Sequence, residues 1–291
     1  MKAYIGLGAV LLALIVSGPA WAAPSPPSQV IAGVGFDGSE AARYDAQRDD
    51  YVVSNLGPAG EGNDGFISRV APDGKVTQLK WIAGGVGGVT LIQPLGIYLK
   101  GDLLYVADIR TVRTFDRRTG APRKSFEIPG ALRLNDLVVA DDGTVYVTDS
   151  GQGEQAGALY RIDAAGRVTS FAERSPALER PNGIALTADG LIVHGGRGVN
   201  LVYRDRDGHI VREQTLPTGQ FDGIVLAPDG SLLVASQLGR NVYRVPADGS
   251  APTVVAEGIE VPAAIGLDTR RDRLLVPQIR AGSLSLFDLT P

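Results

Sequence analysis

The strongest constraint on this chain is an internal repeat. From about residue 36 onward, one pattern recurs six times: a small or polar residue, an apolar run, a turn that is most often Asp-Gly, and a second apolar run. The six units open at Glu40, Leu95, Asn135, Asn182, Asp222 and Ala263. Such regular spacing indicates one structural unit that is copied along the chain.

Four of these units continue with a second pair of short runs. These runs alternate around a tight glycine turn, as in GALYRIDAAGRVTSFA and NVYRVPADGSAPTVVA. Four short strands per unit are typical of a β-propeller blade. A β-sandwich is the alternative, but it does not explain the repetition of whole four-strand units. The sequence therefore predicts an all-β, six-bladed β-propeller.

The two ends of the repeat region predict how the ring closes. The last unit ends at GSLSLFDLTP, one strand short, and the run SQVIAGVGF at residues 28–36 has no unit of its own. We expect this N-terminal strand to pair with the last blade, because that pairing removes two exposed sheet edges. The propeller would then be a single domain over residues 28–291.

The N-terminus resembles a secretory signal. Lys2 precedes an apolar run at residues 3–18, and Ala20 and Ala22 fit the small-residue cleavage pattern. We predict a signal peptide at residues 1–22, a flexible lead-in at residues 23–27, and a periplasmic or secreted protein. An uncleaved anchor is the alternative, although the run is short for a membrane span. The chain has no cysteine, so its core must stabilise the fold without disulfides.

Composition excludes some partners and leaves others open. The formal net charge is −4 and no Lys/Arg run stands out, so we expect neither nucleic acid nor, after cleavage, a membrane as a partner. The 38 glycines and 44% hydrophobic residues suit a turn-rich globular β protein. The oligomeric state is left open.

The residues that open the units are candidates for one shared site. The innermost strand of each blade lines the central channel, so the unit openings gather at one mouth. This ring would contain Glu40, Asn135, Asn182 and Asp222, with Gly96 or a neighbour and Ala264 from the other two blades. Oxygen-only donors of this kind suit Ca²⁺ or a similar divalent ion. A single Asn-Gly or Asp-Gly could be ordinary turn chemistry, but that chemistry does not call for Glu40.

Four segments carry a resemblance to a known family. EAARYDAQRDDYVVSN, RLNDL, RPNGI and FDGIV are similar to motifs of the senescence-marker-protein/gluconolactonase/regucalcin superfamily, which includes luciferin-regenerating-enzyme-like proteins. A Gly-Pro after the glutamate and a tryptophan at the position of Tyr44, both part of that family's first motif, are absent here. The resemblance covers nearly all of the chain after the signal and implies six blades around one divalent metal.

The resemblance also implies roles for individual residues. Glu40, Asn182 and Asp222 would be metal ligands, Asn135 a fourth ligand or a substrate contact, and Arg133 a substrate contact. Ca²⁺ is the expected cation, with Zn²⁺, Mg²⁺ and Mn²⁺ as alternatives. The family contains lactonases, phosphotriester hydrolases and members of unknown activity.

A site of this kind predicts hydrolysis of a small molecule. A bound cation would polarise a lactone carbonyl, and Asp222 would act as the base or as the nucleophile. Three hypotheses follow: an exported metal-dependent hydrolase of lactones or related esters, a non-catalytic ligand- or partner-binding propeller with a structural metal, and a metal-stabilised structural propeller whose family site is vestigial. No Cys-His system competes, since cysteine is absent, and of the two histidines we expect His194 in the core and His209 on an outer turn.

Overall fold

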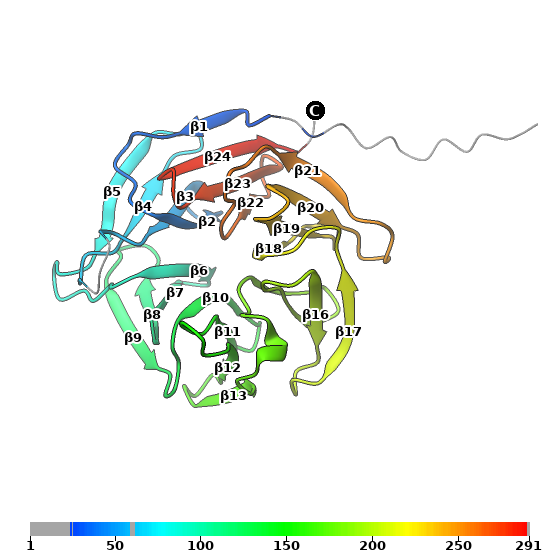
Figure 1. The fold of residues 1–291 in the computed structure, drawn as a ribbon. Helices are drawn as coiled ribbons and strands as arrows, with labels where there is room; N and C mark the ends of the chain where they lie inside the picture. The colour runs from blue at the N-terminus through cyan, green and yellow to red at the C-terminus, as the bar shows by residue number, and fades with distance from the viewer. Residues whose placement is uncertain (1–23, 25, 59–61, 290–291) are drawn as a thin grey trace, which may run out of the picture.

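The computed structural model describes residues 24, 26–58 and 62–289. Six four-stranded antiparallel sheets form a ring around a central channel, which confirms the predicted six-bladed β-propeller (Figure 1). Within the described residues, the only helix is a single 3-10 turn at Pro176–Leu178, and no helix there is long and apolar enough to span a membrane. The predicted signal peptide lies outside the described residues.

The blades follow one another along the chain, and their strands run in chain order from the channel outward. Blade one contains β2 (Ser39–Asp45), β3 (Asp50–Asn55), β4 (Phe66–Val70) and β5 (Val76–Ala83). Blade two contains β6 (Pro94–Lys100), β7 (Leu103–Asp108), β8 (Thr111–Asp116) and β9 (Pro122–Glu127). Blade three contains β10 (Leu134–Val139), β11 (Val145–Asp149), β12 (Ala158–Ile162) and β13 (Val168–Ala172).

The second half of the ring repeats this order. Blade four contains β14 (Ile184–Leu186), β15 (Ile192–His194), β16 (Asn200–Arg204) and β17 (Ile210–Thr215). Blade five contains β18 (Phe221–Leu226), β19 (Leu232–Ser236), β20 (Asn241–Val245) and β21 (Thr253–Glu257). Blade six contains β22 (Gly266–Asp268), β23 (Arg273–Gln278), β24 (Ser283–Asp288) and, as its outer strand, β1 (Gln29–Ile31).

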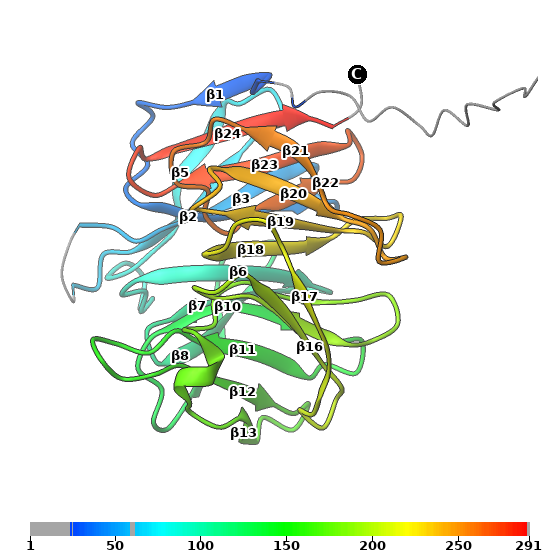
Figure 2. The ribbon, with the colours of Figure 1, turned by 45° about the vertical axis from the view of Figure 1, so that its right-hand side comes forward.

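The N-terminal strand closes the ring as the sequence predicts. β1 pairs antiparallel with β24, with Val30 opposite Ser285, and both views show it along the outer edge of the last blade (Figures 1 and 2). The paired segment is shorter than the predicted run of residues 28–36. Gly33 and Gly35 adopt φ angles of 68° and 96°, which an extended strand does not accommodate, so pairing ends at Ile31.

Apolar side chains hold neighbouring blades together. One core cluster joins Val52 and Ile67 of blade one to Leu104 and Phe115 of blade two. Another joins blades four and five in the same way. Because each blade buries its faces against the next, the ring fixes where the inner strands meet at the channel.

His194 is part of this core, at the end of β15. Its side chain is buried, and its Nε2 atom accepts a hydrogen bond of 3.1 Å from Arg204 Nε. Burial, assisted by the positive charge of Arg204, lowers the pKa of His194 to about 3. The imidazole is therefore neutral in the folded protein at any pH near neutrality.

We predict that His194 contributes to acid denaturation. Its pKa is lower in the folded than in the unfolded state, so its contribution to stability is present above about pH 6.5 and is lost as the pH falls toward 3. Between about pH 6 and pH 4, His194→Gln should lose stability less steeply than the wild type, by up to about 1.4 kcal/mol per pH unit. Urea unfolding across this range measures the slope. His209→Gln, at an exposed turn, is the matched control, and equal slopes for His194→Gln and the wild type would contradict the assignment.

Candidate metal centre

A β-bulge lies at the start of four inner strands and gives each of them one residue at an equivalent position of the ring. In blade one, Ser39 pairs with Asn55 and Ala42 with Val53, so residues 40 and 41 lie opposite one residue. The same shift occurs between Leu134 and Leu137 and between Phe221 and Ile224. Glu40, Asn135 and Asp222 therefore occupy the same bulge position. Asn182 takes the equivalent place in blade four, where its N–H donates to Gly195 O at 2.8 Å.

The glycines that follow two of these residues are required by packing and not by a turn. A Cβ atom on Gly183 would lie 1.6 Å from Asp222 O, and one on Gly223 would lie 2.2 Å from Ile265 N. Each glycine lets the inner strand of the next blade approach closely. Asp222-Gly223 lies within β18, so ordinary turn chemistry does not explain this dipeptide.

Apolar residues occupy the two remaining positions of the ring. The register shift between Pro94 and Ile97 gives Leu95 the equivalent position in blade two, which agrees with the expectation of Gly96 or a neighbour. In blade six, the pairs Pro262↔Gln278 and Gly266↔Leu275 bracket the bulge, which gives Ala263 that position in place of Ala264. Both residues are apolar, so oxygen donors come from four of the six blades.

Buried hydroxyl groups tie the inner strands of neighbouring blades together. Thr148 Oγ1 accepts from Asp136 N at 3.0 Å and donates to Asn182 O at 2.6 Å. Ser54 Oγ does the same between Ala41 N, at 2.9 Å, and Leu95 O, at 2.7 Å. These hydroxyls satisfy backbone groups that the bulges leave outside the regular ladder, and they fix the positions of the candidate ligands.

We expect Thr148→Val to lower the free energy of unfolding by about 1–3 kcal/mol, because valine keeps the shape but leaves the Asp136 N–H and the Asn182 carbonyl unpaired. Urea unfolding of the wild type and the variant measures this difference. Thr90→Val, at an exposed position, is the control and should be nearly neutral. A Thr148→Val protein as stable as the wild type would show that the bridge does not hold the two blades.

The four candidate ligands share one property. Each has a buried oxygen for which no described residue supplies a hydrogen bond: Glu40 Oε2, Asn135 Oδ1, Asn182 Oδ1 and Asp222 Oδ1. Buried oxygens are normally paired, so four unpaired ones at equivalent positions need an explanation. A cation that accepts hard oxygen ligands supplies it.

Hydrogen bonds to the neighbouring atoms fix how two of these side chains are turned. Ser150 Oγ donates its hydrogen to Pro181 O at 2.7 Å, so it can only accept from Asn135 Nδ2, at 3.0 Å. The Asn135 amide is thereby oriented with its oxygen free. Gln237 Nε2 donates to Asp222 Oδ2 at 2.7 Å, which leaves Oδ1 as the free oxygen of that carboxylate.

The electrostatics of the ring favour a bound cation. Burial raises the pKa of Glu40 to about 7, and the negative charge of Asp136 adds to this, while Arg133 and Arg43 act in the opposite direction. Burial also raises the pKa of Asp222 well above its usual range, and Glu40 is the next largest cause. Two buried carboxylates that disfavour each other's charge are stabilised when a divalent ion lies between them.

Asp136 is a buried carboxylate that the sequence did not assign to the site. It lies next to Asn135 on β10, and its Oδ1 atom is 3.2 Å from Arg43 NH2 on β2. Arg43 also donates to the backbone carbonyl of Ala264 at 3.0 Å. Arg43 NH2 lies within hydrogen-bond distance of both oxygens of Asp136, so neither is free as a further candidate ligand. The two residues are 93 positions apart, and no sequence pattern links them.

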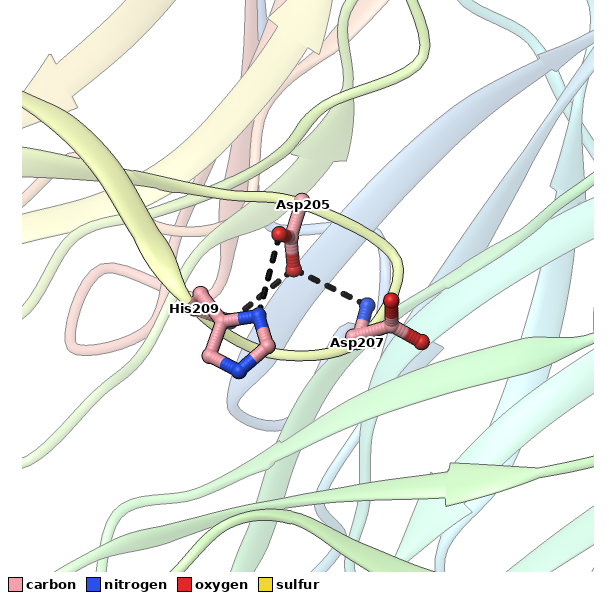
Figure 3. Close-up of side chains that lie close together, drawn as sticks. All are labelled: Asp205, Asp207 and His209. Carbon is pink, nitrogen blue, oxygen red and sulfur yellow. Dashed lines mark hydrogen bonds and ion pairs between the residues drawn. The ribbon is translucent and has the colours of Figure 1, made fainter.

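A second acidic group lies far from the channel, in the turn between β16 and β17. Asp205, Asp207 and His209 offer ligand atoms within 4.8 Å of one another (Figure 3). However, Asp205 Oδ1 accepts from the N–H groups of Asp207 and His209 at 2.9 Å, and Oδ2 lies 3.1 Å from His209 Nδ1. The turn itself uses this carboxylate, which is ordinary Asp-turn chemistry, and His209 is on an outer turn as expected.

A pocket of about 250 Å³ opens beside the ring. Its lining includes Asn135, Asn182 and Arg133. The backbone N–H of Arg133 donates to Asp149 Oδ1 at 2.9 Å, so the end of β11 fixes the loop that carries this arginine. A larger cavity of about 500 Å³ lies further along the inner strands, where Lys100 and Arg206 pair with Asp141 and Asp142. The structure therefore places all five predicted site residues at one mouth of the channel, and their roles stay predictions.

The fold and the ring define a class of protein. The family model described as SMP-30/Gluconolactonase/LRE-like region matches residues 63–278, more than half of the chain. The chain therefore belongs to this family, which confirms the resemblance seen in its motifs. Among curated protein sequences, none matches the chain.

Solved structures show the same fold. A calcium-binding protein, regucalcin from Agrobacterium tumefaciens, has a TM-score of 0.69 at 17% identity, over 91% of this chain and 95% of that one. A protein described as a candidate gluconolactonase has a TM-score of 0.65 at 16% identity, over 90% and 93% of the two chains. A luciferin-regenerating enzyme has a TM-score of 0.65 at 17% identity, over 89% and 94%. At these identities the likeness shows the fold alone.

Proposed function

We propose that this chain is an exported, metal-dependent hydrolase that opens lactones or related esters. The observation that carries the proposal is the set of four buried oxygens without hydrogen-bond partners, which four different blades bring to one mouth of the channel. Glu40, Asn135, Asn182 and Asp222 would hold one divalent cation, and Ca²⁺ is the ion best suited to oxygen-only ligands of mixed charge.

The residues of the ring and pocket have distinct roles in this proposal. The cation, when bound, supplies polarisation of the carbonyl and stabilisation of the oxyanion. Asp222 would accept a proton from water through Oδ2, the oxygen that is not assigned to the cation, as the water oxygen bonds to the carbonyl carbon. The ring C–O bond then breaks and the leaving oxygen takes up that proton, which gives the hydroxy acid. Gln237 holds Asp222 in place through Oδ2, and Arg133 orients the substrate from the pocket wall.

The comparisons support the coarser part of this proposal. Family membership supports a lactonase-type or regucalcin-like role that acts on a small molecule. Hydrolysis by this chain, the identity of the ion and the substrate are our proposals. Export and a periplasmic or secreted location rest on the N-terminal sequence pattern alone.

A second candidate function is calcium binding without turnover. The similar structure described as a calcium-binding protein favours this alternative. Both functions use the same four oxygens and therefore differ only in whether a substrate is hydrolysed.

The distinguishing experiment is a panel of lactones and esters assayed with the mature protein. Hydrolysis should be measured after chelation and after readdition of Ca²⁺, Mg²⁺, Mn²⁺ or Zn²⁺. Metal-dependent hydrolysis of at least one compound supports the hydrolase. Metal binding without hydrolysis across the panel favours the calcium-binding alternative.

A further inference from the structure

The pocket beside the ring is lined by positive charge only. Its ionisable lining residues are Arg133, Arg180 and Arg197, and no carboxylate is among the residues that line it. The chain as a whole carries a net charge of −4. The pocket therefore carries the opposite sign of charge to the chain as a whole, beside the ring of candidate ligands.

The repeat brings two of these arginines to the same wall. Arg133 stands two residues before Asn135, and Arg180 stands two residues before Asn182. Gln220, two residues before Asp222, completes the series in the next blade and also lines the pocket. Since these positions are equivalent in blades three, four and five, their side chains surround one space.

Backbone hydrogen bonds hold this wall in one arrangement. Arg197 N donates to Glu179 O at 2.7 Å, and Gln220 N donates to Arg197 O at 3.2 Å. Arg180 and Gln220 both adopt a φ angle of 59°, a left-handed backbone conformation that residues other than glycine rarely adopt. Strained residues persist where the surrounding structure fixes them, and they cluster at ligand sites.

No arginine of the pocket wall forms an ion pair with an acid among the described residues, although Arg133 lies close enough to the Glu40 carboxylate to lower its pKa. Arg180 donates to the backbone carbonyls of Gly153, at 2.8 Å, and Gly151, at 3.4 Å. The guanidinium groups of Arg133 and Arg197 form no hydrogen bond or ion pair with any described residue. Glu179, the residue before Arg180, packs its carboxylate against Gly198 and pairs with no arginine of the described chain.

The remaining charges of the site balance without these arginines. A divalent cation offsets Glu40 and Asp222, and Arg43 offsets Asp136. Three guanidinium groups are then left facing the pocket. We propose that they select substrates that carry a negatively charged group, a carboxylate or a phosphate, beside the lactone or ester that reacts.

This inference rests on the proposed function and names its substrate class. Guanidinium groups bind carboxylate and phosphate oxygens through paired, charge-assisted hydrogen bonds. At about 250 Å³ the pocket is smaller than the cavities that enclose drug-sized ligands, so it accepts a small anionic molecule. Arg133 was assigned to the substrate by resemblance, whereas Arg180 and Arg197 come from the geometry.

The test compares substrates that share one lactone ring and differ in the attached group. Three lactones with the same ring should be assayed with the Ca²⁺-loaded protein: one bearing a carboxylate, one bearing the nearly isosteric neutral carboxamide, and one bearing a phosphate. We expect kcat/KM to be about tenfold higher or more for the charged compounds, since a hydrogen bond to a charged group contributes about that much. The carboxylate and phosphate arms show which anion is preferred.

Variants of the wall test which residues make the selection. Arg197→Gln and Arg180→Gln should each lower the ratio of kcat/KM between the carboxylated and neutral lactones by about tenfold. Arg118→Gln, at an exposed turn of blade two, should keep the wild-type ratio. An equal kcat/KM for charged and neutral lactones, or an unchanged ratio in both variants, would overturn the inference.

A binding arm separates this inference from the proposed hydrolysis. A carboxylated γ-lactam, which resists opening, and its methyl ester should be titrated into the Ca²⁺-loaded protein by calorimetry. Tighter binding of the carboxylated lactam supports the anion-selective pocket even where no lactone is hydrolysed. Equal binding, or none, overturns the anion selection whether or not lactones are turned over.

Discussion

Asp222→Asn is expected to lower kcat/KM for any lactone that the wild type hydrolyses by about 100-fold or more. The amide has nearly the same shape as the carboxylate, but it accepts no proton at neutral pH. In the wild type, Gln237 Nε2 donates to Asp222 Oδ2 and leaves Oδ1 for the cation. The asparagine side chain has one oxygen in place of these two. Weaker metal binding should therefore accompany the loss of turnover.

Steady-state kinetics at saturating Ca²⁺ separates these two effects. Enough Ca²⁺ should restore metal occupancy of the Asp222→Asn protein without restoring kcat. Asp248→Asn, in an exposed turn of blade five, is the matched control and should keep full activity. An Asp222→Asn enzyme with wild-type kcat would refute the catalytic role while leaving the propeller intact.

Removal of the cation is expected to lower the melting temperature by about 10 °C. An ion at 1,000 times its Kd stabilises the folded state by about 4 kcal/mol, which corresponds to such a shift in a domain of this size. The effect should be large here because the metal-free ring retains two buried carboxylates that raise each other's energy. Melting curves in chelator and in millimolar Ca²⁺ measure the shift.

Variants distinguish the ring from the exposed acidic turn. Glu40→Gln should reduce the Ca²⁺-dependent shift, whereas Asp205→Asn should leave it unchanged because the turn already uses that carboxylate. Identical melting curves in chelator and in Ca²⁺ would show that the ring does not bind the ion. A shift abolished by Asp205→Asn would place the ion in the outer turn.

The repeat made most of the fold predictable from the sequence. Six copies of a four-strand pattern determine the blade count, and the unpaired run before Glu40 predicts the closing strand. The exact length of that strand was not predictable, because its end depends on the backbone conformation of Gly33 and Gly35.

The candidate site was predictable only where the repeat marks it. Glu40, Asn135, Asn182 and Asp222 could be found because equivalent positions in a ring must converge. For Glu40, Asn135 and Asp222, the bulge that places them at equivalent positions is apparent only from the strand register. The same register moved one ring position, from Ala264 to Ala263.

Contacts between distant segments carry no sequence signal of this kind. Gln237 and Arg197 reach the site from loops that follow second strands, where neither lies at a unit opening. The pairing of Arg43 with Asp136 joins the inner strands of blades one and three, which are separated by blade two in the ring. Such contacts arise from closure of the ring and not from any local pattern.

Diffraction from a crystal soaked in Mn²⁺ tests the central claim most directly, because an anomalous difference map locates the ion without any assumption about activity. We predict one strong peak within about 2.0–2.6 Å of Glu40 Oε2, Asn182 Oδ1 and Asp222 Oδ1, with Asn135 Oδ1 beside it. No peak in the channel, or a peak only at Asp205, Asp207 and His209, would contradict the account.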